Sequence, residues 1–147
     1  MQKLIAVLTL GAALSLVLVA LAPAAPRAEV YTFKAPMNSR SEVPKPKGAA
    51  GAKGNFSGTL KGSTLKWTLT FSGLSGAATA AHIHMGKAGV AGPVLVPLCG
   101  PCKTGATGTA KLTASQEKAM ESGGAYVNVH TAKNAGGEIR GQITSKG

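Results

Sequence analysis

Three histidines are the residues of this chain whose type and spacing point most directly to chemistry. His82 and His84 lie two positions apart, and His130 ends a run in which valines alternate with polar residues. On an extended strand, residues two positions apart share one face. Each imidazole therefore lies opposite the apolar residues of its own strand, such as Ile83. We expect the three rings either on the outer surface or beneath a loop.

Three imidazoles that converge would form a metal site. Copper suits such a site, because imidazole is among its preferred ligands and because copper has the highest affinity in the divalent series. The interpretation predicts that His82, His84 and His130 hold one copper ion, with ring nitrogens within about 4 Å of each other. The spacing also allows an alternative, in which two strands carry histidines on polar faces that never meet.

The segments that must position these histidines follow a period-two pattern of apolar and polar residues, separated by Gly-rich turns. About eight short strands of this kind predict an all-β sandwich or barrel. A capping-box sequence, Thr followed three residues later by Gln, predicts one short helix at Ala114–Glu121. Met85 shares a face with Ile83 and is expected in the core rather than on a metal. The other expected core residues are Trp67, Leu69, Ile83, Val127, Val129 and Ile139.

The last two strands are expected to form a hairpin through a Gly-rich turn. In that hairpin, Glu138 and Arg140 share the polar face with His130, so a carboxylate and a guanidinium lie beside the third imidazole. A metal-bound histidine usually donates its second nitrogen to an acceptor that orients the ring. Glu138 or a backbone carbonyl is the expected acceptor.

The two cysteines, Cys99 and Cys102, form a C-x-x-C sequence. In thioredoxin-like redox centres this motif opens a helix within a βαβ unit, and no helical pattern follows it here. An oxidising compartment favours a disulfide instead. We predict that Cys99 and Cys102 pair with each other in a surface loop, while metal binding or thiol chemistry stays open as the alternative.

The N-terminal segment, residues 1–25, has the organisation of a signal peptide: a basic Lys3, a long apolar run and a small-residue cleavage pattern. The apolar run is long enough to span a bilayer, so an uncleaved anchor is the alternative. We expect cleavage, which gives a periplasmic or secreted protein without a transmembrane anchor. Residues 30–145 are then expected to form a single domain.

Lys and Arg number 16 against five acidic residues, and the formal net charge is +11. Such a charge often indicates nucleic-acid binding. The few aromatic residues, 4% of the chain, offer no stacking platform for bases, so nucleic acid is not expected as a partner. The expected partners are a metal ion and anionic groups, such as cell-envelope polymers, lipid headgroups or a small anionic substrate.

Five motifs occur in order along the chain: Glu42-Val43-Pro44, Ala81-His82-Ile83-His84, Gly92-Pro93-Val94, Tyr126-Val127-Asn128-Val129-His130-Thr131 and Gly137-Glu138-Ile139-Arg140-Gly141-Gln142. Together they resemble the CHRD (chordin) domain of exported bacterial proteins. The resemblance implies little about activity, because no general biochemical function is settled for that domain.

The order of the histidines is also similar, more weakly, to the copper half of Cu/Zn superoxide dismutases. This similarity implies a Greek-key fold, superoxide-dismutase-like or immunoglobulin-like, with His82, His84 and His130 as copper ligands. It implies that Arg140 guides an anionic substrate. It implies no zinc subsite, because the chain contains no Asp and no further histidine.

Three functions stay open on these grounds. The first is an exported metal-binding module that holds copper for sequestration or delivery. The second is a structural or adhesive extracellular domain without metal. The third is a copper-only enzyme of the superoxide-dismutase type, and since nothing in the sequence requires catalysis, enzymatic activity is uncertain and the less expected outcome.

Overall fold

The computed structural model describes residues 29–147, so the predicted signal peptide at residues 1–25 lies outside the described residues. Within that range, no helix is long and apolar enough to cross a membrane. The described chain forms nine strands, one α-helix and one short 3-10 helix. Their bounds are β1 (Val30–Asn38), η1 (Ser39–Ser41), β2 (Lys53–Lys61), β3 (Thr64–Ser72), β4 (Ala78–Met85), β5 (Val94–Cys99), β6 (Ala106–Lys111), α1 (Ala114–Glu121), β7 (Ala125–Thr131), β8 (Ile139–Gln142) and β9 (Thr144–Lys146).

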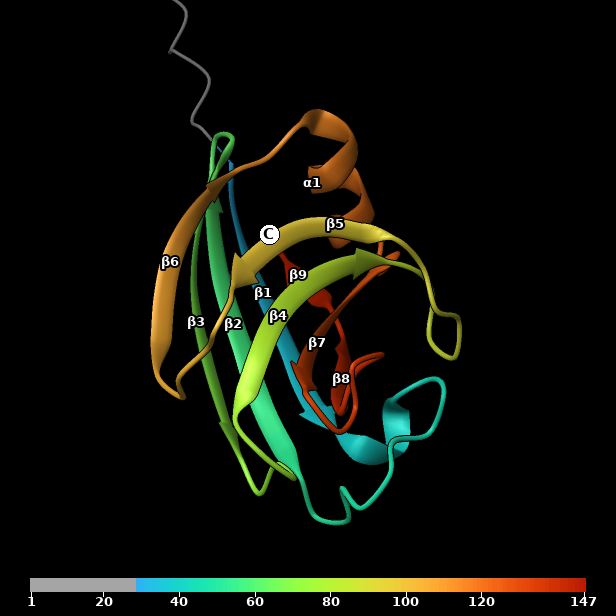
Figure 1. Ribbon diagram of the computed structural model, residues 1–147. Helices are drawn as coiled ribbons and strands as arrows, with labels where there is room; N and C mark the ends of the chain where they lie inside the picture. The colour runs from blue at the N-terminus through green and yellow to red at the C-terminus, as the bar shows by residue number, and fades with distance from the viewer. Residues whose placement is uncertain (1–28) are drawn as a thin grey trace, which may run out of the picture.

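The strands form one antiparallel sheet in the order β5-β4-β7-β8-β1-β2-β3-β6, and β9 pairs with β1. The two edge strands, β5 and β6, approach each other, so the sheet curls into a nearly closed barrel (Figure 1). The chain crosses between distant strands from β3 to β4 and from β6 to β7. These crossings give the barrel its Greek-key connectivity. The predicted all-β Greek-key fold is confirmed.

The barrel interior is filled by the apolar positions of the alternating pattern. Burial alternates strictly along β2, and all six residues expected in the core are buried. Trp67 is the largest of them, and Gly58 and Gly108 lie beside it on the two neighbouring strands. A Cβ at Gly108 would lie 2.4 Å from Cζ2 of Trp67, so glycine makes room for the indole.

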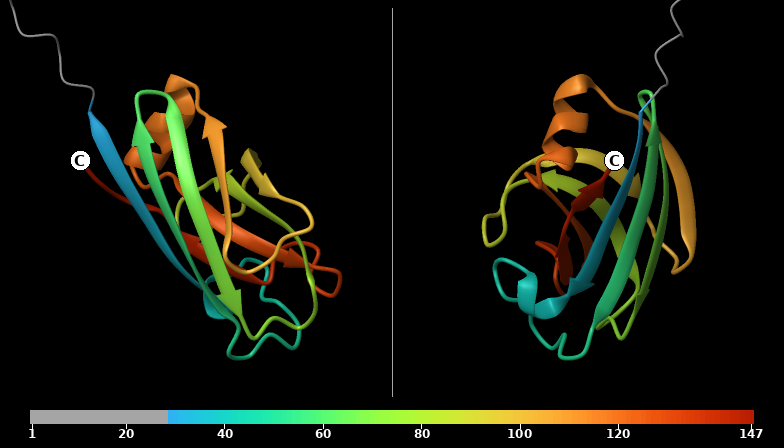
Figure 2. Two further views of the ribbon diagram at one scale, coloured as in Figure 1. Left: turned by 90° about the vertical axis from the view of Figure 1, so that its left-hand side faces the viewer. Right: turned by 180° about the vertical axis from the view of Figure 1, so that it is seen from behind.

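The two halves of the barrel differ on their outer faces. Strands β1, β2, β3 and β6 expose every outward residue except half-buried Thr64, whereas all seven residues of β7 are buried. Three connecting segments, residues 39–52, 86–93 and 132–137, contact the outer face of β4, β7 and β8, as Figure 2 lets the reader follow. The histidines therefore lie beneath loops, which is one of the two placements expected from the sequence.

The helix and the disulfide match their predictions. Helix α1 has the capping box formed by Thr113 and Gln116, and it lies over one end of the barrel (Figure 1). Cys99 and Cys102 form a disulfide with a Cα–Cα distance of 5.3 Å. The connecting residues are exposed, but the Cys102 side chain is buried and its backbone N–H donates to Ala78 O. The disulfide therefore fixes the end of β5 beside the start of β4.

The prediction that Met85 lies in the core is wrong. Its side chain is 44% exposed. The pairing of β4 with β5 shifts register between Ile83 and His84, and the strand ends at Met85. Ile83 is buried in the core and His84 beneath the loop 86–93, whereas Met85, the last residue of β4, lies beyond the register shift of β5 and extends into solvent.

Candidate metal centre

The three histidines lie on two neighbouring strands, β4 and β7, on the face that the loops cover. In the pairing of these strands, His84 is opposite Tyr126, and His130 is opposite Ala80. His82 therefore lies diagonally across from His130 and one step along β4 from His84. One ligand nitrogen from each ring lies within 4.8 Å of the other two, so the structure brings the three imidazoles together.

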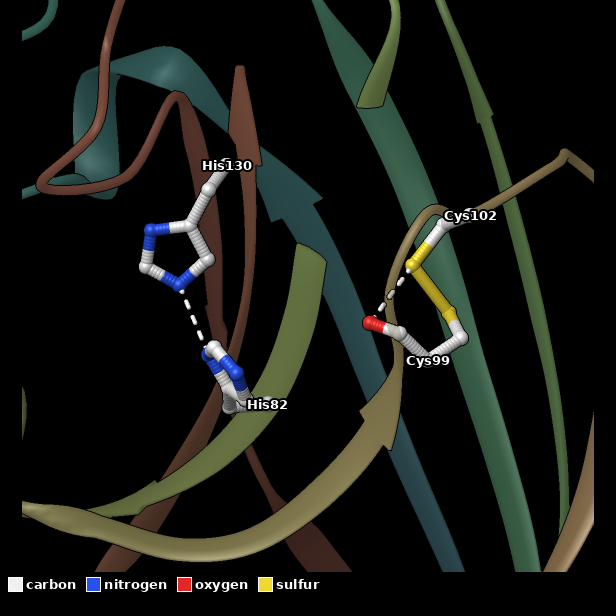
Figure 3. The surroundings of a disulfide bond; sticks show 4 residues. All are labelled: His82, Cys99, Cys102 and His130. Carbon is white, nitrogen blue, oxygen red and sulfur yellow. Dashed lines mark hydrogen bonds between the residues drawn. A yellow bond between two sulfur atoms is a disulfide. The ribbon is translucent and has the colours of Figure 1, made fainter. Parts of the chain in front are cut away.

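His82 and His130 form the closest pair in the cluster. His82 Nδ1 lies 3.0 Å from His130 Nε2, and Figure 3 shows the two rings pointing toward each other. The His84 ring centroid lies 5.5 Å from that of His82 and 6.0 Å from that of His130. The close pair meets the predicted separation of about 4 Å, and the triad as a whole is slightly wider.

Backbone carbonyls orient two of the three rings. His84 Nδ1 lies 2.8 Å from Gly92 O, and His130 Nδ1 lies 3.0 Å from Ala135 O. A carbonyl oxygen only accepts, so each Nδ1 carries a proton, and in a neutral ring this tautomer leaves the lone pair on Nε2. Among the described residues, His84 Nε2 is buried and has no hydrogen-bond partner. The predicted carbonyl acceptor is therefore confirmed, twice.

Glu138 orients none of these rings. Its carboxylate accepts hydrogen bonds from Ser75, from the Thr131 hydroxyl and from the Asn134 side-chain amide. Burial opposes ionisation, but the hydrogen bonds from Ser75, Thr131 and Asn134 outweigh it and hold the pKa of the Glu138 carboxyl below its usual value. The carboxylate thus ties β7 and its following turn to the chain near Ser75. The prediction that Glu138 faces His130 is wrong, because the carboxylate is directed to these loop donors.

Arg140 is buried, at 1% exposure, and is directed at the protein itself. Its guanidinium lies over the Tyr126 ring, 3.4 Å from Cζ to the ring centroid, and Nη2 donates to Lys87 O. The opposite neighbour of Tyr126 is His84, whose ring stacks on the tyrosine at 5.1 Å and 13°. Strand β7 lies between β4 and β8, so Tyr126 lies between the guanidinium and the imidazole.

The Tyr126 hydroxyl links this stack to the loop that covers it. Gly92 N donates to the hydroxyl at 3.1 Å, and Gly92 O is the acceptor for His84 Nδ1. One residue of the loop 86–93 therefore contacts both the tyrosine and the histidine. No role of Tyr126 was predicted from the sequence, although its alternation with His130 placed it on the same face of the strand.

A second residue without an assigned role is Glu42, which is buried beside Arg140 and Asn128. Burial raises the pKa of the Glu42 carboxyl, although the Val43 N–H, the Arg140 charge and the Asn128 amide act in the opposite direction. A Cβ at Gly137 would lie 2.4 Å from Glu42 Oε2, so the turn after β7 contacts this carboxylate closely. The Glu42-Val43-Pro44 motif was therefore the sequence signal for this contact.

The pKa shifts of His82 and His130 favour the neutral form of these two imidazoles. Burial lowers the pKa of His82, and the neighbouring His130 and His84 lower it further. Burial also lowers the pKa of His130, against the opposing effect of its hydrogen bond to Ala135 O. Because a histidine binds a metal through an unprotonated nitrogen, the cluster is ready to hold a metal ion at neutral pH.

Comparison with protein families and known proteins gives one match. The family model of the CHRD domain matches residues 33–143, which span the barrel from β1 to the end of β8 and include all three histidines. No curated protein and no solved structure matches the chain. The family match covers most of the chain, and the chain therefore belongs to the CHRD domain family.

Proposed function

We propose that this CHRD domain is an exported copper-binding module that holds one copper ion through His82 Nδ1, His84 Nε2 and His130 Nε2. The observation that carries the proposal is the unpartnered, buried Nε2 of His84, which lies beside the close pair formed by the other two rings. A buried polar atom without a partner is costly, and a metal ion would supply the partner.

The spacing of the ring nitrogens fits a single ion. Two nitrogens that each lie about 2.0 Å from one metal ion are about 3.0 Å apart when the angle between the bonds is roughly 95–100°. The separation of His82 Nδ1 and His130 Nε2 is 3.0 Å. Two nitrogens bound to the same metal ion are at most about 4 Å apart. The ligand nitrogens of the three histidines lie within 4.8 Å of one another, so the most distant two would have to move closer by under about 1 Å to bind one ion.

The ligand set favours copper over other ions. Three imidazoles without a carboxylate or thiolate suit copper, which also has the highest affinity in the divalent series. Zinc is the competitor, because three histidines also form catalytic zinc sites. Sequestration or delivery of copper outside the cytoplasm fits the segment with signal-peptide organisation and the Cys99–Cys102 disulfide.

A structural role without metal is the second candidate, and one observation favours it. The contact between His82 Nδ1 and His130 Nε2, at 3.0 Å, is also a good hydrogen bond. The Nδ1 groups of His84 and His130 are already paired with backbone carbonyls. The copper-only enzyme has weaker support, because the expected anion guide, Arg140, is buried under the loop 86–93.

Calorimetric titration of the metal-free protein with Cu(II), and separately with Zn(II), tests the proposal. The expected result is one tight Cu(II) site in the wild type, weaker Zn(II) binding and no tight Cu(II) site in His84→Ala. Met85→Ala is the matched control, since this exposed neighbour lies outside the cluster and its loss should leave binding unchanged. Equal Cu(II) binding by the wild type and His84→Ala would overturn the proposed site. If the wild type binds no stoichiometric copper, the copper proposal is wrong and the structural role without metal is favoured.

A further inference from the structure

The half of the barrel away from the histidines presents an ordered array of lysine and hydroxyl side chains. Strand β9 extends the array, because Thr144 pairs with Lys34 and Lys146 pairs with Thr32. We call this surface, the outward residues of β9, β1, β2, β3 and β6, the lysine–threonine face. The registers align three rows across the strands: Lys146-Thr32-Thr59-Lys66-Thr109, Thr144-Lys34-Ser57-Thr68-Thr107 and Val30-Lys61-Thr64-Lys111.

The charge of this face has one sign. It carries six lysines, and the five strands contain no Asp or Glu. Of the five acidic residues, Glu42 and Glu138 are buried in the other half of the barrel. The remaining three, Glu29, Glu117 and Glu121, line a separate hollow at the end of the barrel near α1. No carboxylate among the described residues therefore neutralises the centre of the face.

A shallow hollow of about 650 Å³ lies over the middle of the face and is lined by the β1, β2, β3 and β6 members of both long rows. The broad sheet that forms it faces the viewer in the left view of Figure 2, where β1, β2, β3 and β6 lie side by side. Lys34 and Lys66 border this hollow, and Thr and Ser hydroxyls lie between them. Neighbouring strands are about 4.8 Å apart, so hydroxyl groups repeat at close intervals across it.

We propose that the lysine–threonine face binds an acidic polysaccharide, a chain of sugars that carries carboxylate groups. The lysines are complementary to its charges, and the hydroxyls match its many hydrogen-bonding groups. Each exposed ion pair is weak and screened by salt, so affinity must come from several lysines acting together. This site is independent of the histidine cluster and lies on the opposite half of the barrel.

Three other occupants fit the face less well. A nucleic acid would use exposed aromatic rings for base stacking, and the aromatic residues of these strands point inward or are half-buried. A membrane surface would use exposed apolar residues, and Val30, at the edge, is the only one of the exposed large apolar residues in 29–147 that lies here. A second copy of the chain would place like charges against each other.

Binding of immobilised polygalacturonate by the purified protein, measured at increasing NaCl concentration, tests the proposal. The variant K34Q/K66Q/K111Q should lose about tenfold in affinity and show a shallower salt dependence. The control K45Q/K118Q/K133Q removes the same charge from exposed loop and helix positions outside the face, and it should stay within about twofold of the wild type. Both variants should keep the wild-type circular dichroism spectrum and Cu(II) titration.

The comparison of ligands decides between the occupants. Neutral dextran should not bind, and duplex DNA and phosphatidylglycerol vesicles should bind more weakly than polygalacturonate at matched salt. Tighter binding of DNA or of vesicles would overturn the assignment to polysaccharide. Equal losses in the two triple variants would show that total charge, rather than this face, attracts the polymer and would overturn the site.

Discussion

The barrel has two contrasting outer faces, the covered face of β4, β7 and β8 and the open lysine–threonine face. Both consist of residues that point away from the barrel interior. On the covered face, His84, Tyr126 and Arg140 stack in a fixed order, and carbonyls of the loops hold the rings. On the open face, the lysines extend into solvent and only Lys111 contacts a hydroxyl of the face, Thr64. Chemistry that needs atoms at fixed positions fits the first face, and binding that depends on the number of charges fits the second.

The difference has a physical cause. A polar group that loses contact with water must find a protein partner, because an unpaired buried group costs about 1–3 kcal/mol. Covering β4, β7 and β8 with loops therefore requires specific hydrogen bonds for nearly every polar atom. The few atoms of that face left without a partner, among them His84 Nε2 and Arg140 Nη1, are then informative. On the open face, water forms hydrogen bonds with the same kinds of groups. A side chain there that has no protein partner therefore gives no indication of a ligand.

The largest effect that separates the two faces should come from Glu138→Ala. The substitution leaves the donors of Ser75, Thr131 and Asn134 without their acceptor in a buried setting, so the free energy of unfolding should fall by about 3 kcal/mol. Urea unfolding followed by circular dichroism measures it. Lys66→Ala on the open face is the control and should change stability by under about 0.5 kcal/mol. Similar losses in both variants would contradict the distinction between the faces.

A smaller effect is expected from Tyr126→Phe. The variant keeps the ring between Arg140 and His84 but loses the hydroxyl that accepts from Gly92 N, so the loop that orients His84 should loosen. The dissociation constant for Cu(II) should rise about threefold to tenfold, below the range for groups bonded directly to a ligand. Tyr31→Phe, which removes a hydroxyl bonded to exposed Glu29, is the matched control and should bind copper like the wild type. An unchanged constant for Tyr126→Phe would show that the hydroxyl does not position the ring.

The smallest effect concerns pH. Burial lowers the pKa of His82 and His130 in the folded protein, so the unfolded chain binds more protons near pH 6.5 and below. The stability of the metal-free protein should therefore be fully present above pH 6.5 and should decrease as the pH falls below that value. Urea midpoints between pH 7.5 and 5 measure the slope.

The double variant His82→Asn/His130→Asn is the control for this slope. The raised pKa of Glu42 acts with the opposite sign on acidification, since a folded state that takes up a proton more readily gains stability as the pH falls. The Glu42 contribution is common to both proteins, so their difference isolates the histidines. Equal slopes for the wild type and the double variant would contradict the assignment.

Much of the site follows from local patterns that the sequence displays. The alternation around His82, His84 and His130 put the imidazoles on one side of two strands, and the hairpin prediction put Arg140 on the same polar face. The side-chain period of a strand is two regardless of its neighbours, so these inferences need no tertiary information. The exposure of Met85 was not predictable, because the end of a strand and a register shift depend on the partner strand.

The roles of individual polar residues were predicted less well. Arg140 is directed at Tyr126 and a loop carbonyl, and Glu138 is directed at Ser75, which lies 63 residues away in the chain. Arg140 is on the expected strand and the expected face, whereas Glu138 immediately precedes β8 and is directed to loop donors rather than to His130. Their partners come from distant loops, and no local spacing identifies which distant segment will supply a donor or an acceptor.

Local sequence alone specified the strands, the capped helix, the pairing of the two cysteines and the side of each strand on which the histidines lie, because each depends on neighbours a few residues apart. Tertiary folding selected which outer face is covered. The loops 39–52, 86–93 and 132–137 come from separate parts of the chain and meet only over β4, β7 and β8. They bury the histidines there and leave the lysines in water, because a loop without periodic pattern acquires its position only from the strands that it connects.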